Sequence, residues 1–196
     1  MCCFLVNRGI LTPAVESLAE RVRRMIENYP CIHPAITCAA SLAHHGLLGS
    51  LRDVRLVDVD LTSIPAEHLA SLVSSVTGCV TIKNVSGCNL VSILNSASVK
   101  SKELDFGRYQ SLGSEETQAL VQAMESRVEI VWLCGGLTLD IKILMEYSGQ
   151  GKCKEMKCFR DTAVRYKEQL RAWATSRNWQ VVTYFDDNRL FIIERM

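Results

Sequence analysis

Short runs of alternating apolar residues recur along this chain at nearly constant intervals. Each run carries two apolar residues separated by one position, and the pairs are Val54 and Leu56, Val80 and Ile82, Leu104 and Phe106, Val128 and Ile130, and Met156 and Cys158. Alternation with a period of two is typical of a β-strand that buries one face. The first members of successive pairs lie 26, 24, 24 and 28 residues apart. The sequence therefore predicts five evenly spaced strands.

Between the predicted strands, apolar residues recur at spacings of three, four and seven, which place them on one face of a helix. Two such stripes are Leu69, Leu72, Val73 and Val76, and Leu120, Val121 and Met124. One strand–helix unit cannot bury both of its apolar faces alone, whereas stacked units bury them against each other. Helices need about 10 Å and strands about 4.8 Å, so the stack curves. We therefore predict an α/β fold, a short curved solenoid with parallel strands on the concave face and helices on the convex face.

The two ends of the chain differ from the repeating middle. Residues 12–30 have the pattern of an amphipathic helix, whose apolar face holds Val15, Leu18, Val22 and Ile26. Residues 180–196 have the pattern of two strands joined by a polar turn, which predicts a hairpin. Terminal repeats must cover the ends of the core. We expect one domain overall, with a helical N-terminal cap at residues 1–50, about five repeats at 51–178, and a C-terminal β-hairpin cap at 179–196.

Two stretches resemble a known family. Residues 54–61, "VRLVDVDL", look like the L-x-L-x-x-N/C-x-L segment of leucine-rich repeats, and residues 111–124, "SLGSEETQALVQAM", are similar to the LG-x-E-G-x-x-AL-x-x-AL helix of the ribonuclease-inhibitor type. Such repeats also form the C-terminal sensor region of NOD-like receptors. The resemblance covers roughly residues 50–180. It implies a leucine-rich-repeat solenoid with a recognition function, linked to innate-immune sensing.

The chain departs from the family pattern at one repeated position. Where leucine-rich repeats carry Asn or Cys, this sequence has Val59, Val85, Tyr109, Leu133 and Asp161. The family's side-chain ladder, which satisfies loop backbone groups, is therefore absent or replaced, and we expect degenerate repeats. An ordinary α/β sheet with crossover helices shares the same strand–helix rhythm and stands as the alternative.

Composition narrows the setting of the protein. Of the 196 residues, 48% are hydrophobic and 22% charged, which is typical of a packed soluble chain. The formal net charge of +1 gives no overall field that would attract nucleic acid. The nine cysteines lie mostly in apolar runs, which favours reduced thiols in an intracellular protein. With neither a secretory leader nor an apolar run of membrane-spanning length, we expect a cytoplasmic protein that does not insert into a membrane.

One cluster of residues has the types that metal or nucleophilic chemistry needs. Cys31, His33, Cys38, His44 and His45 lie within fifteen residues. Zinc accepts such ligands, but the spacing C-x-H-x4-C-x5-HH fits no common zinc motif. We therefore expect no metal, no cofactor and no enzymatic activity. A small α/β enzyme or metal-binding protein that uses this cluster is the alternative function.

The leucine-rich-repeat reading instead points to a binding surface on the concave face. Residues between and just after each core pair point out of the sheet there, and the large aromatic and basic ones have the composition of an interface hot spot. The predicted binding residues are Trp132, Phe159, Arg108, Arg160, Lys83 and Arg55. The expected partner is another protein or a microbial ligand. The sequence predicts no oligomeric state.

Overall fold

The computed structural model describes residues 13–29, 32–97, 103–107, 110–134, 137–184 and 190–196. Its strands are β1 (Val54–Asp60), β2 (Cys79–Ser86), β3 (Glu103–Gly107), β4 (Ile130–Leu133), β5 (Glu155–Phe159), β6 (Trp179–Tyr184) and β7 (Leu190–Arg195). Its helices are α1 (Pro13–Asn28), α2 (His33–His44), α3 (Ala66–Ser74), α4 (Leu90–Ala97), α5 (Ser114–Ser126), α6 (Ile141–Leu144) and α7 (Arg160–Ser176). Among the described residues, none of these helices combines the length and apolar character needed to cross a bilayer.

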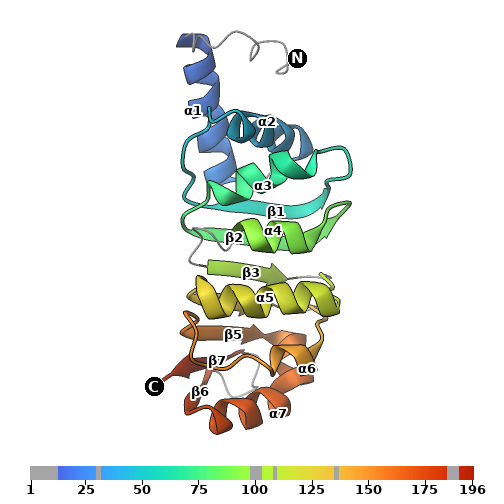
Figure 1. The fold of residues 1–196 in the computed structure, drawn as a ribbon, viewed down its shortest axis with the longest axis vertical. Coiled ribbons are helices and arrows are strands. Elements are labelled where there is room, and N and C mark those ends of the chain that lie inside the picture. The colour runs from blue at the N-terminus through green and yellow to red at the C-terminus, as the bar shows by residue number, and fades with distance from the viewer. Residues whose placement is uncertain (1–12, 30–31, 98–102, 108–109, 135–136, 185–189) are drawn as a thin grey trace.

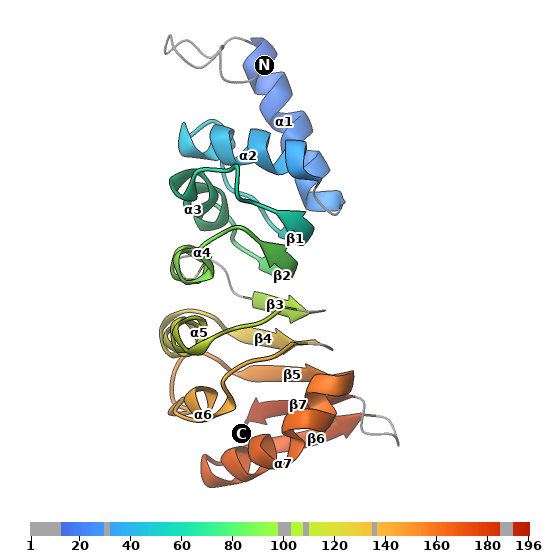
Figure 2. The same cartoon turned by 90° about the vertical axis from the view of Figure 1, so that its right-hand side faces the viewer.

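The strands form one open, mostly parallel sheet in the order β1-β2-β3-β4-β5-β7-β6 (Figure 1). Strands β1 to β5 each pair in parallel with the next. Helices α3 to α6, which follow the first four strands, lie on one face of the sheet (Figure 2). The predicted α/β class and parallel strand pairing are confirmed. The expected C-terminal hairpin is present as β6 and β7, but β7 inserts between β5 and β6, antiparallel to both.

Strand register places equivalent residues of successive units beside each other. Val54 lies opposite Val80, Val80 opposite Leu104, Leu104 opposite Val131, and Val131 opposite Met156, so partners are 26, 24, 27 and 25 residues apart. All five side chains are at most 1% exposed and point toward the helices, where they form the core. Alternate residues of these strands point to the opposite face, as the period of two requires.

The fourth strand corrects one prediction. Its core pair is Val131 and Leu133, both fully buried, rather than Val128 and Ile130. Val128 is also buried, but it lies before the strand, where its N–H donates to the Ala123 carbonyl at 2.9 Å. Because "IVWL" is apolar at every position, alternation alone does not fix its register, and a shift by an odd number of residues exchanges the two faces. Val131 therefore belongs to the core, not to the outward-facing set.

Polar side chains join neighbouring units near the ends of β1 and β2. Asp58 and Asn84 have positive φ angles of 50° and 49°, and the Asn84 amide donates to Asp58 Oδ1 at 2.8 Å. Asp and Asn tolerate this backbone conformation better than most residues. One position further, the Val85 N–H donates to Oε1 of Gln110 at 3.0 Å, and Gln110 is only 4% exposed. A glutamine from the following unit thus satisfies a backbone group inside the core.

Each end of the sheet is covered by its own elements. At the N-terminal end, Val22 and Ile26 of α1 are buried, and both belong to the face predicted from their spacing. At the C-terminal end, Tyr147, Trp173 and Trp179 form an aromatic cluster with ring centroids 5.3–6.1 Å apart. The Trp173 indole N–H also donates to the Tyr147 carbonyl at 3.1 Å, which joins α7 to the chain after α6.

Replacing Gln110 by leucine tests the proposed role of its amide. Leucine fills a similar volume but leaves the Val85 N–H without an acceptor, so the free energy of unfolding should fall by about 1–3 kcal/mol. Gln122→Leu, on the exposed side of α5, is the matched control and should change stability by about 0.5 kcal/mol or less. Urea denaturation measures both, and equal effects of the two variants would contradict the role of Gln110.

Candidate functional site: the open face of the sheet

We call the side of β1–β5 that points away from helices α3 to α6 the open face. Register aligns one row of side chains across it: Arg55, Thr81, Asp105, Trp132 and Lys157 lie opposite one another on five successive strands. These residues are spread over about a hundred positions of sequence. Parallel pairing alone brings them together, since neighbouring strands are only about 4.8 Å apart.

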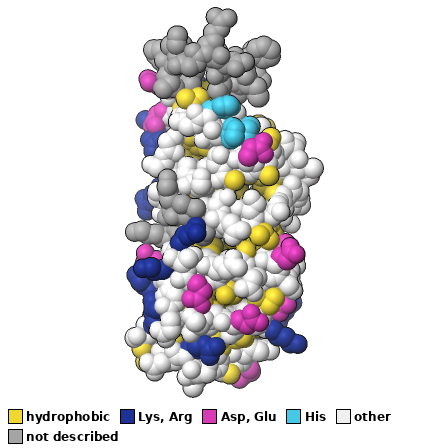
Figure 3. Space-filling model, in the orientation of Figure 1, with side chains coloured by type: hydrophobic (Ala, Val, Ile, Leu, Met, Phe, Trp, Pro, Cys, Tyr) yellow, Lys and Arg dark blue, Asp and Glu magenta, His cyan; other side chains and the backbone are white. Residues whose placement is uncertain are grey.

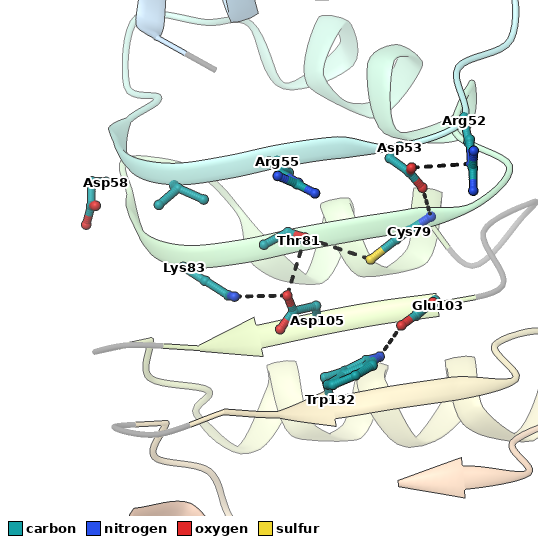
Figure 4. Close-up of a pocket in the computed structure, with 11 residues that line it drawn as sticks. Arg52, Asp53, Arg55, Asp58, Cys79, Thr81, Lys83, Glu103, Asp105 and Trp132 are labelled. Carbon is teal, nitrogen blue, oxygen red and sulfur yellow. Dashed lines mark hydrogen bonds and ion pairs between the residues drawn. The ribbon is translucent and has the colours of Figure 1, made fainter. Parts of the chain in front are cut away.

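A hollow of about 730 Å³ lies on the open face over β1 to β4 (Figure 4). Charged and polar groups dominate its lining, which consists of Arg52, Asp53, Arg55, Val57, Asp58, Cys79, Thr81, Lys83, Glu103, Asp105 and Trp132. Such a surface suits a ligand that forms many hydrogen bonds better than one that offers only apolar groups.

Most charges in the hollow are already paired. Lys83 Nζ lies 2.9 Å from Asp105 Oδ2, and the Thr81 hydroxyl donates to the same oxygen at 3.5 Å. Asp53 accepts the N–H of Cys79 at 2.8 Å, and its other oxygen lies 3.6 Å from Arg52 Nε. These contacts appear as dashed lines in Figure 4. They hold the centre of the hollow in a defined arrangement.

Arg55 is different from these paired groups. Its side chain is exposed, and within the described residues it has no hydrogen-bond or ion-pair partner. The lining as a whole holds three cationic and four anionic side chains, a formal sum of −1. The hollow therefore combines a slightly negative surround with one unneutralised guanidinium at its β1 end.

Trp132 stands at the β4 end and is held by three side chains. Its ring stacks on Phe159 with centroids 5.5 Å apart and an interplanar angle of 11°. The Lys157 ammonium lies 4.2 Å from the ring centroid, and the indole N–H donates to Glu103. Both aromatic residues are only partly buried. Trp132 and Phe159, two of the predicted binding residues, are thus in contact on the open face.

The structure brings together part of the predicted binding set. Arg55, Lys83 and Trp132 line one hollow, and Phe159 supports Trp132 from β5. Arg108 lies outside the described residues, as does the side chain of Arg160, which begins α7.

Sequence reasoning missed part of what positions these residues. Lys157 and Asp105 had been placed on the outward side without a role, and Glu103 had not been singled out. Strand register was the signal that could have identified these residues, because it places Asp105 and Lys157 directly beside Trp132. The composition of each strand taken separately does not show this.

Cys79 lines the hollow, and the Cys134 thiol donates to Oδ1 of Asp105 at 3.3 Å. Burial raises the pKa of both the Cys79 and the Cys134 thiol to about 12, and Asp105 adds to the effect at Cys134. Both thiols are therefore protonated near neutral pH, a state in which a cysteine is a poor nucleophile. The described cysteines Cys38, Cys79, Cys88, Cys134, Cys153 and Cys158 are all free thiols.

The histidines gather elsewhere, near one end of the helical face (Figure 3). The His44 ring stacks on His68 at 4.2 Å between centroids, and His45 lies 5.2 Å from His44. His33 instead contacts the Ser63 hydroxyl at 2.9 Å, and Cys31 lies outside the described residues. In the described part of the chain, no three His, Cys, Asp or Glu side chains are arranged to hold a metal ion.

No protein-family model, curated protein or solved structure matches this chain. The likeness to leucine-rich repeats therefore rests on the residues quoted above. Any function has to be argued from the chemistry of the open face.

Truncating Trp132 measures how much its stack contributes. Loss of the aromatic and cation–π contacts should lower the free energy of unfolding by about 1–2 kcal/mol for Trp132→Ala. The buried Trp173, 5% exposed, is the comparison, and Trp173→Ala should cost about 3–5 kcal/mol. A double-mutant cycle with Phe159→Ala should return a coupling of about 0.5–1.5 kcal/mol. If Trp132→Ala lowered the free energy of unfolding as much as Trp173→Ala does, Trp132 would have to be counted as a core residue.

Stability should depend on pH through His68. Burial and the neighbouring His44 lower the pKa of His68 below its usual 6.5, and Glu67 and His45 also act on it. The unfolded chain then binds the proton more readily. The contribution of His68 to the free energy of unfolding is therefore fully present above about pH 6.5 and is lost as the pH drops below that value. Thermal melts between about pH 7.5 and 5 should show this decline, with a shallower slope in His68→Gln. An identical slope in the variant would contradict the assignment.

Proposed function

We propose that this protein is a non-catalytic recognition module that binds another protein through the open face. The observation that carries the proposal is the Trp132–Phe159 stack, a partly exposed aromatic pair beside a polar hollow. Aromatic residues surrounded by satisfied polar groups are the usual anchors of protein–protein interfaces. The protonated thiols of Cys79 and Cys134 favour binding over nucleophilic catalysis on this face.

The proposal includes a leucine-rich-repeat architecture of the ribonuclease-inhibitor type. Recurrence of paired positions every 24 to 27 residues, and helices on one face, support a short curved solenoid of about five repeats at 51–178. The helices within 1–50 and the hairpin within 179–196 would act as its caps, because each covers one end of the core. The open face is then the concave face.

The resemblance to the sensor region of NOD-like receptors suggests the biological setting. We take the partner to be a host or microbial protein met in the cytoplasm during innate-immune sensing. The free thiols of the described cysteines are in keeping with a reducing compartment. No nucleic-acid or membrane partner is proposed, because the formal net charge of +1 gives no overall field that would attract a polyanion.

Selection of binders from a phage library of random linear peptides tests the proposal. Peptides enriched on the parent protein should lose about 30-fold or more in affinity for Trp132→Ala, the effect of removing an interface anchor. Gln122→Ala on the helical face is the control and should leave their affinity unchanged. Peptides that bind Trp132→Ala as tightly as the parent would locate recognition elsewhere and overturn the proposal.

A further inference from the structure

One cation of the hollow, Arg55, indicates which chemical group the partner carries. Each acidic and basic side chain of the lining has a hydrogen-bond or ion-pair partner within the described residues, with the exception of Arg55. A guanidinium presents several N–H donors and pairs best with a carboxylate or phosphate. Among the described residues that line the hollow, Arg55 is thus the charged group that is left for a partner to bind.

The sum of charges around Arg55 limits the kind of anion. The lining is −1 overall, so a ligand with many negative charges, such as a nucleic acid, would meet Asp53, Asp58 and Asp105 as repelling neighbours. A single carboxylate can approach Arg55 without bringing further charge near those residues. This favours one acidic side chain in an otherwise uncharged segment.

The register of the sheet sets the distance between the two ends of the hollow. Arg55 on β1 and Trp132 on β4 belong to the same row and are three strands apart, which is about 14 Å at the usual strand spacing. An extended peptide advances about 3.3 Å per residue, so about four residues span this distance. Thr81, which is only 6% exposed, and Asp105, which is paired with Lys83, lie between the two ends.

We propose that the hollow binds an extended protein segment that places one Asp or Glu on Arg55 and, about four residues away, an apolar or aromatic side chain on Trp132. The proposal rests on the recognition function argued above and specifies its partner. The guanidinium selects a carboxylate, the aromatic end supplies the apolar contact, and the distance between them selects the spacing.

The test uses the Trp132-dependent peptides selected on the parent protein. Their sequences should be enriched in an acidic residue about four positions from an apolar or aromatic one. Arg55→Ala should weaken their binding about 10- to 100-fold, the effect of losing a charge-assisted hydrogen bond. Arg52→Ala is the matched control, since Arg52 also lines the hollow but lies beside Asp53, and it should change the affinity less than about 3-fold.

A charge exchange gives a second readout. Arg55→Glu should reject the selected peptides, and replacing their acidic residue by lysine should restore binding to this variant but not to the parent. Arg55 is exposed and has no partner within the described part of the chain, so neither variant should change the melting behaviour of the protein.

The outcomes separate the two proposals. Trp132-dependent peptides that ignore Arg55, or that carry no acidic residue, would overturn the inference on the partner while leaving recognition through the open face intact. Peptides that are indifferent to Trp132 would overturn both.

Discussion

In-register pairing of five parallel strands is the constraint on which the rest of this structure depends. Because helices α3 to α6 cover one face, every second strand residue is committed to the core and the others to the open face. The neighbours of an outward-facing side chain are therefore residues one unit away in sequence. Thr81 meets Asp105, and Asp105 meets Trp132, only because Val80, Leu104 and Val131 align beneath them.

The sequence predicted what depends on periodicity and failed where periodicity is ambiguous. Val54 and Leu56, which are separated by Arg55 and preceded by Asp53, were predicted to lie in the core, and both are buried there. The run from Ile130 to Leu133 allows two registers, and the structure has the one that buries Val131 and Leu133. The role of Gln110 was not predicted. Its amide accepts a hydrogen bond from Val85, which lies twenty-five residues away, and no local sequence pattern indicates such a contact.

The candidate site could be found only in part for the same reason. Trp132 and Phe159 were selected by residue type, and the sheet places their rings together. The pairing of Lys83 with Asp105, which leaves Arg55 as the unneutralised cation, depends on side-chain geometry across two strands. Composition gives the number of charged residues but not which of them form ion pairs, and this pairing determines the chemistry of the hollow.

The two ends of the hollow differ in how far they are organised before a partner arrives. Trp132 is fixed by Phe159, Lys157 and Glu103, so its burial by a ligand requires little further ordering. Within the described residues Arg55 makes no such contacts, and ordering a flexible side chain at an interface costs about 0.5–1.5 kcal/mol. In the proposed binding mode the affinity would therefore come mainly from the aromatic end. The guanidinium would offset its own ordering cost only when bound to a carboxylate, so it would act mainly on the choice of partner.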